Sequence, residues 1–283
     1  MWSNYLLYTI FIAQIFFVSY YFPMRLVKQT FRILEKYSPE EYPKLYPVSR
    51  DVAVLRIINF KRFNLAIALI GVAIVMHAIV TQSEEFLFAD SMAVILAYFM
   101  LQWVPLLMME FSGLQYLKLM RMANTSPKRS AALKPRGLLD YVSKPALAFT
   151  IFMQLAFVAV VIYFIYNPFE GFGGVANLAG IVFADCFFIG ILLWNIKGKK
   201  KNPYLATEDR EKQMRQLVKV MLITSNLMIA FVSLELVMSA AESRHLLDPF
   251  MSLYFLAIAS VSYQAYQVKG IDFEVYREKS ASS

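Results

Sequence analysis

Seven apolar stretches of about 20 residues constrain the fold of this chain more than any other feature of its sequence. A helix of about 20 residues crosses the roughly 30 Å hydrocarbon core of a membrane. Lipid offers the backbone no hydrogen-bonding partners, so segments of this kind have to be helical. We therefore predict an all-α, polytopic integral membrane protein in which residues 1–283 form a single seven-helix domain. The predicted transmembrane spans are residues 3–22, 63–82, 90–109, 146–166, 175–196, 219–240 and 250–268.

The composition supports a membrane protein and excludes several other classes. Hydrophobic residues make up 59% of the chain and charged residues only 17%, whereas about 25% of an average soluble domain is charged. A soluble domain of 283 residues cannot bury that much apolar surface. Soluble enzymes, disordered tails and nucleic-acid-binding proteins are therefore excluded, and no nucleic-acid partner is expected.

The basic residues predict an orientation in the membrane. Of the 28 Lys and Arg residues, nine lie in segment 23–62, seven in 110–145, seven in 197–218 and three in 269–283. These segments all fall on one side if every span is real, and Lys and Arg are enriched on the cytoplasmic side. We therefore expect the N-terminus outside the cell, and three basic loops and the C-terminal tail in the cytoplasm.

The single Asn-x-Ser/Thr sequence, Asn124-Thr125-Ser126, lies in a predicted cytoplasmic loop. No glycosylation acceptor therefore faces outward. We expect a multi-pass protein of the cell membrane, and a bacterial inner membrane is compatible with this pattern.

Basic side chains after the first span are spaced so that they share one face of a helix, which predicts that the first helix continues into the cytoplasm. A second basic run follows the fifth span. We consider two interpretations. These residues form a platform for a cytoplasmic protein or for anionic lipid headgroups, or they only secure the topology. The candidates for binding a partner or lipid are Arg25, Lys28, Arg32, Lys199, Lys200 and Lys201.

Ionisable residues inside membrane spans are costly and are by default candidates for function. Asp185 lies near the middle of its span, and Glu235, Ser239 and Glu242 recur at helical spacing on one face. They predict a polar, outward-opening cavity that binds a proton, a cation or another ligand. The structural alternative is a carboxyl group satisfied by polar side chains of a neighbouring helix. The candidates for ligand or ion binding are Asp185, Glu235, His77, Asp90, Ser239 and Glu242.

The chain lacks most of the chemistry that a catalytic site needs. Two His residues and the single Cys186 cannot build a His-rich or Cys-rich metal site. The HExxH, GxSxG and P-loop motifs are absent. We therefore expect no metal, no cofactor and a non-enzymatic protein of membrane transport or of ligand or ion sensing. Two alternatives stay open: a non-catalytic membrane subunit or scaffold that docks a partner through its basic loops, and an intramembrane enzyme acting on lipid.

Small residues at Ala176, Gly180 and Ala184 form a stripe on the fifth span. Stripes of this kind let two helices approach closely in a membrane. The stripe is compatible with a homo-oligomer but does not require one.

Overall fold

The computed structural model describes residues 2–82, 86–124, 137–198, 202–266 and 272–278, and no strand occurs in this part of the chain. Seven helices are long and apolar enough to cross a membrane, by length and composition. The all-α class and the number of spans are thereby confirmed. The chain has the features of a multi-pass membrane protein.

The first membrane helix is continuous from α1 through the π-helix η1 into α2. The helical segments are α1 Trp2–Gln14, η1 Ile15–Tyr21, α2 Phe22–Lys36, α3 Arg50–Thr81, α4 Ser91–Ala123, α5 Lys144–Tyr166, α6 Ala176–Lys197, α7 Thr207–Ala240 and α8 Leu247–Ala265. The extension of the first helix to Lys36 confirms the helical pattern of its basic residues. Helix α3 begins 13 residues before its predicted span, because residues 50–62 contain no Pro or Gly that would end it.

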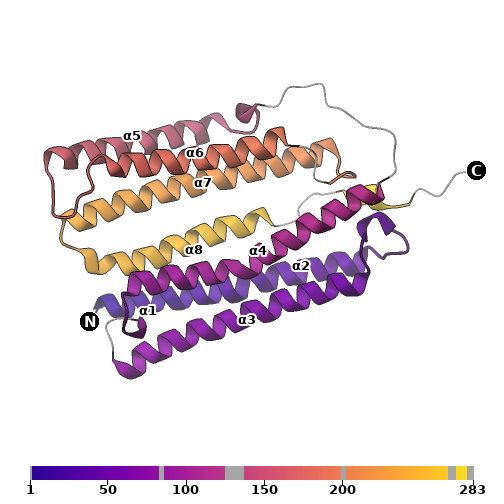
Figure 1. Cartoon of the computed structure of the whole chain (residues 1–283), viewed down its shortest axis with the longest axis horizontal. Coiled ribbons are helices and arrows are strands. Elements are labelled where there is room, and N and C mark those ends of the chain that lie inside the picture. Colours follow the sequence, from indigo (N-terminus) through magenta and orange to yellow (C-terminus); the bar gives the residue numbers. More distant parts are fainter. Residues whose placement is uncertain (1, 83–85, 125–136, 199–201, 267–271, 279–283) are drawn as a thin grey trace, which may run out of the picture.

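The helices form two groups that meet along α7 and α8, with the N-terminus at the end of the bundle where α3 ends and α4 begins (Figure 1). In the first group, α1 to α4 and α8 share one hydrophobic core, in which Phe99 and Phe255 stack with ring centroids 3.9 Å apart. In the second group, α5 and α6 pack against α7. Phe231 on α7 stacks on Tyr254 of α8 with ring centroids 4.6 Å apart, and this contact joins the two groups.

Large apolar side chains also cover the outside of the helices. Leu69 on α3 is 71% exposed, and Phe183 and Trp194 on α6 are 76% and 80% exposed. Exposed apolar surface on this scale is unfavourable in water and is typical of helices that face lipid. Gly180 of the small-residue stripe is exposed as well, and a Cβ atom at this position would meet no atom within 4 Å. Gly180 therefore makes no close helix contact within the described part of the chain.

Residues 272–278, which we call the C-terminal clasp, fold back across the basic end of the bundle. The Tyr276 ring is buried, and its hydroxyl accepts a hydrogen bond from Asn202 Nδ2 at 2.6 Å. The Tyr42 hydroxyl donates to Glu274 Oε1 at 2.8 Å. The clasp thus links the connection after α2 to the connection after α6, and it ties together segments that belong to the two helix groups.

The clasp is expected to open at alkaline pH. The hydrogen bond to the Glu274 carboxylate raises the pKa of Tyr42, and burial raises the pKa of Tyr276. A tyrosine with a raised pKa in the folded state contributes stability below its ordinary pKa of about 10, and this contribution is lost as the pH rises above that value. In limited proteolysis with an alkaline serine protease, the rate of cleavage within the clasp should therefore increase as the pH rises above about 10.

A variant that combines Tyr42→Phe with Tyr276→Phe provides the control, because phenylalanine cannot ionise. Its cleavage rate should depend less on pH in this window than that of the wild type. Equal pH dependence in the two proteins would contradict the assignment to these tyrosines.

Candidate functional site

Asp185 lies half-buried near the middle of α6 and is hydrogen-bonded from both neighbouring helices. Ser225 on α7 donates from its hydroxyl to Asp185 Oδ1 at 2.9 Å. Gln154 on α5 donates from Nε2 to Asp185 Oδ2. Among the described residues no Lys or Arg nitrogen lies within 4 Å of the carboxylate. The structure therefore gives Asp185 two neutral donors from two other helices and no cationic partner.

A second polar pair lies beside the Asp185 carboxylate in the same helix group. Asn226 follows Ser225 on α7, and its Nδ2 donates to Thr150 Oγ1 at 3.1 Å. The Asn226 Oδ1 atom is buried and accepts no hydrogen bond from the described residues. Thr150 is one helical turn before Gln154 on α5. Asp185 with its two donors and the Asn226–Thr150 pair form a polar layer across α5, α6 and α7, which we call the Asp185 layer.

Glu235 is separate from the Asp185 layer. Ser225 contacts Asp185, and Glu235 is ten residues further along α7, which corresponds to about 15 Å of helix. Glu235 and Ser239 are half-buried, whereas Glu242 is exposed and has a positive φ of 55°. These three residues therefore lie in or just beyond the C-terminal part of α7, away from Asp185.

The remaining two candidates lie near the same end of the bundle. Asp90 is exposed and caps α4, because its carboxylate accepts a hydrogen bond from the Met92 backbone N–H at 3.3 Å. His77 is half-buried in the last turns of α3. The position of Asp90 gives it a structural role as a helix cap.

The structure describes three of the six basic residues that were predicted to bind a partner or lipid. Arg25, Lys28 and Arg32 are exposed on one face of α2, and Val27 and Leu34 are buried on the other. This arrangement confirms the amphipathic pattern of the segment. The basic run Lys199, Lys200 and Lys201 lies outside the described residues.

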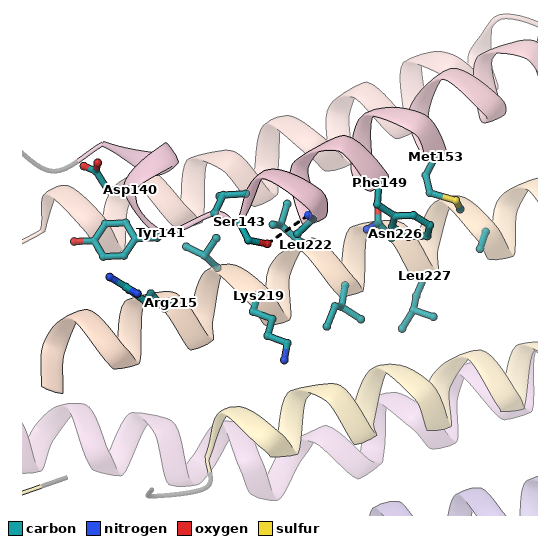
Figure 2. A pocket seen from close by; sticks show the side chains of 15 residues that line it. Asp140, Tyr141, Ser143, Phe149, Met153, Arg215, Lys219, Leu222, Asn226 and Leu227 are labelled. Atoms are coloured by element: carbon teal, nitrogen blue, oxygen red, sulfur yellow. Dashed lines mark hydrogen bonds between the residues drawn. The ribbon is translucent and has the colours of Figure 1, made fainter. Parts of the chain in front are cut away.

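A cavity of about 640 Å³ lies between α5, α7 and the turn that precedes α5. Figure 2 shows Tyr141 and Arg215 at one end of the cavity, Lys219 one turn further along α7, and apolar side chains beyond it. Asn226 and Phe149 lie in the inner part, so the cavity borders the Asp185 layer. Pockets for small ligands have volumes of about 300–1,000 Å³. The cavity is therefore large enough to hold a ligand.

A polar network in the first helix group is a feature that reasoning from ionisable residues missed. Gln14 Nε2 donates to Gln102 Oε1 at 2.8 Å, and Gln102 Nε2 donates to Ser19 Oγ at 2.8 Å. The Ser252 hydroxyl donates to Gln14 Oε1 at 2.6 Å, and the Tyr98 hydroxyl donates to the Ile67 carbonyl at 3.0 Å. These side chains are almost completely buried. Glutamines inside predicted spans were the signal that could have located this network.

The π-helix η1 explains how Gln14 and Ser19 reach the same partner. Residues five apart in an α-helix point about 140° away from each other. The wider turn of a π-helix, with i→i+5 hydrogen bonding, brings such residues much closer to the same side of the helix. Gln14 immediately precedes η1 and Ser19 lies within it. The local change of helix type therefore directs both side chains toward Gln102.

The described residues contain no group of three or more His, Cys, Asp or Glu side chains that could hold a metal ion. The fold and the site are those of a helical bundle with seven candidate membrane helices, a carboxyl group near the middle of one of them, and a cavity beside it. No protein-family model, curated protein or solved structure matches this chain.

Proposed function

We propose that the protein is a non-enzymatic membrane transport or ion-sensing protein in which Asp185 binds a proton or a cation. The supporting observation is the carboxyl group near the middle of α6 with two neutral donors and no cationic partner among the described residues. An ionised carboxylate without a counter-charge costs several kcal/mol at the centre of a bilayer, roughly 2.5–3.5 kcal/mol on insertion scales. A bound proton or cation removes this cost.

The surroundings of Asp185 leave few other titratable groups to compete for this role. Helix α5 presents Gln154 and Thr150, and α7 presents Ser225 and Asn226. Lys219 is six residues before Ser225 on α7, which corresponds to about 9 Å of helix. A response to protons or cations at this site would therefore originate from Asp185 itself.

The orientation and location belong to the same proposal. The distribution of Lys and Arg supports an N-terminus outside the cell. The absence of a glycosylation acceptor in the predicted outer loops is compatible with a bacterial inner membrane. The predicted outward opening rests on Glu235, Ser239 and Glu242, which lie in or just beyond the C-terminal part of α7. In this proposal they line the path between the outer face and the Asp185 layer.

Replacing Asp185 with asparagine is expected to abolish the response of thermal stability to pH or to one cation. A ligand that binds only the folded state at 100 times its Kd stabilises that state by about 2.7 kcal/mol. The measurement is the Tm of the detergent-purified protein between pH 5 and 8 with Na⁺, K⁺, Mg²⁺ or Ca²⁺. Wild type should respond to pH or to one of these ions, and Asp185→Asn should not.

Asp90→Asn is the matched control, because it removes the same charge from an exposed helix cap. It should keep the wild-type response. If wild type and Asp185→Asn melt alike under every condition, the Asp185 layer is only a structural hydrogen-bonding network and the proposal is wrong.

A scaffold that docks a cytoplasmic protein or anionic headgroups is the second candidate. The observation that favours it is the exposed basic face of α2 formed by Arg25, Lys28 and Arg32. Basic clusters next to a membrane helix attract anionic lipids and acidic partners. This function does not involve Asp185, and Asp185→Asn would leave it intact.

A further inference from the structure

We propose that the cavity between α5 and α7 binds one anionic membrane lipid. Its headgroup lies at Arg215 and Lys219, and one acyl chain follows the apolar walls toward Ala230. This proposal does not depend on a role for Asp185, which does not line the cavity.

The charges at one end of the cavity select for an anion. Arg215 and Lys219 are one helical turn apart on α7, and both are exposed. No carboxylate of the described residues lies within 4 Å of either cation. Asp140 lines the same end, but its carboxylate already accepts a hydrogen bond from the Gly137 backbone N–H at 2.9 Å. Among the described residues, two cations and one carboxylate therefore line this end of the cavity, which leaves it with a net positive charge.

The length of the cavity matches one leaflet of a bilayer. From Lys219 to Ala230 the lining extends over 11 residues of α7, which corresponds to about 16 Å of helix. Half of a hydrocarbon core of about 30 Å is about 15 Å. Arg215 lies one turn closer to the start of α7, on the predicted cytoplasmic side. A lipid with its headgroup at the two cations would thus place its acyl chain at its natural depth.

The walls of the cavity favour an acyl chain over a water-soluble anion. Phe149 and Met153 from α5 and Leu222 and Leu227 from α7 line the inner part (Figure 2). Phe149 and Ala230 are exposed, so the cavity opens to the surroundings of the helices. At this depth those surroundings are lipid, and filling an apolar cavity with water is unfavourable. The acyl chain of a surrounding lipid is therefore the occupant that fits these walls.

The test compares phosphatidylglycerol, which is anionic, with phosphatidylcholine, which is zwitterionic. Native mass spectrometry of the delipidated protein in a maltoside detergent measures lipid affinity, and thermal melting measures stabilisation. Wild type should bind one phosphatidylglycerol in preference to phosphatidylcholine. Since each cation near an anionic headgroup contributes about 1 kcal/mol, Arg215→Gln combined with Lys219→Gln should weaken phosphatidylglycerol binding about thirtyfold.

Lys118→Gln combined with Arg121→Gln is the matched control. These residues are exposed on α4, near its C-terminal end, and they do not line the cavity. Their replacement removes the same two positive charges as the Arg215 and Lys219 variant. This variant should keep wild-type affinity.

A second pair of variants tests the acyl-chain part without changing charge. Ala230→Trp fills the inner end of the cavity and should reduce lipid binding. Gly190→Trp adds the same side chain to α6 where a Cβ atom meets nothing within 4 Å, and it should not affect binding. If one variant fails to fold, the comparison of the two lipids on wild type and the remaining variants still decides the outcome.

Four results would overturn the proposal. They are equal affinity for the two lipids, unchanged affinity in the Arg215 and Lys219 variant, an equal loss in the α4 control, and stabilisation by soluble glycerol phosphate as large as that by the lipid. The last result would identify a site for free anions. None of these results depends on the response of Asp185 to protons or cations, so the two proposals fail independently.

Discussion

Replacing Gly71 with alanine is expected to lower the free energy of unfolding by about 3 kcal/mol. A Cβ atom at this position would lie 2.3 Å from the Tyr98 hydroxyl oxygen, 2.6 Å from Tyr98 Cζ and 2.8 Å from Ile15 Cγ1. Tyr98 is only 3% exposed. It cannot move aside without weakening its hydrogen bond to the Ile67 carbonyl and its contact with Ser19 at 3.3 Å. Thermal or denaturant unfolding in detergent measures the effect.

Gly190→Ala is the control for this substitution, because no atom lies within 4 Å of the added Cβ. Alanine also forms helices more readily than glycine, so this variant should be neutral or slightly more stable. Adding Tyr98→Leu to Gly71→Ala should cost less than the two single changes together, since the smaller side chain leaves room for the Cβ. A Gly71→Ala protein as stable as wild type would show that the Tyr98 ring is not held where the structure places it.

Replacing Tyr276 with alanine is expected to release the C-terminal clasp at a cost of about 3 kcal/mol of local stability. The ring is 4% exposed and lies against Tyr204 and Phe273, each at 6.0 Å between centroids. Its removal also leaves Asn202 Nδ2 without the acceptor that the Tyr276 hydroxyl supplies at 2.6 Å. Limited proteolysis should then cleave within residues 272–278 far more rapidly than in wild type.

Tyr276→Phe separates packing from hydrogen bonding. It keeps the buried ring and loses only the acceptor for Asn202, so its cost should be about 1 kcal/mol. Equal protection of the clasp in wild type and Tyr276→Ala would mean that Tyr276 does not hold it in place.

The clasp and the Gln14 network act on different parts of the bundle. The network lies inside the first helix group, where it connects α1, η1, α4 and α8. The clasp spans the basic end and connects the segments that follow α2 and α6. Loss of the clasp should therefore affect how the two helix groups are held together, whereas Gly71→Ala should destabilise the first group itself.

The sequence by itself determined the helical class, the number of spans and the helical continuation of the first span to Lys36. These features depend on residues close together in the chain, because hydrophobic runs and helical periodicity are local properties. The choice of Asp185 as an unusual intramembrane group is also local, since its cost in lipid follows from its residue type and depth.

The partners of these residues were decided only by the tertiary structure. Gln154, Asp185 and Ser225 come from three different helices, and so do Gln14, Gln102 and Ser252. Which helices become neighbours depends on how side chains of distant segments pack in lipid, where small local differences in shape and hydrogen bonding select the arrangement. A single sequence records the type of each side chain but not the helix that it will face. Both polar networks and the cavity beside the Asp185 layer therefore became visible only when the helices were assembled.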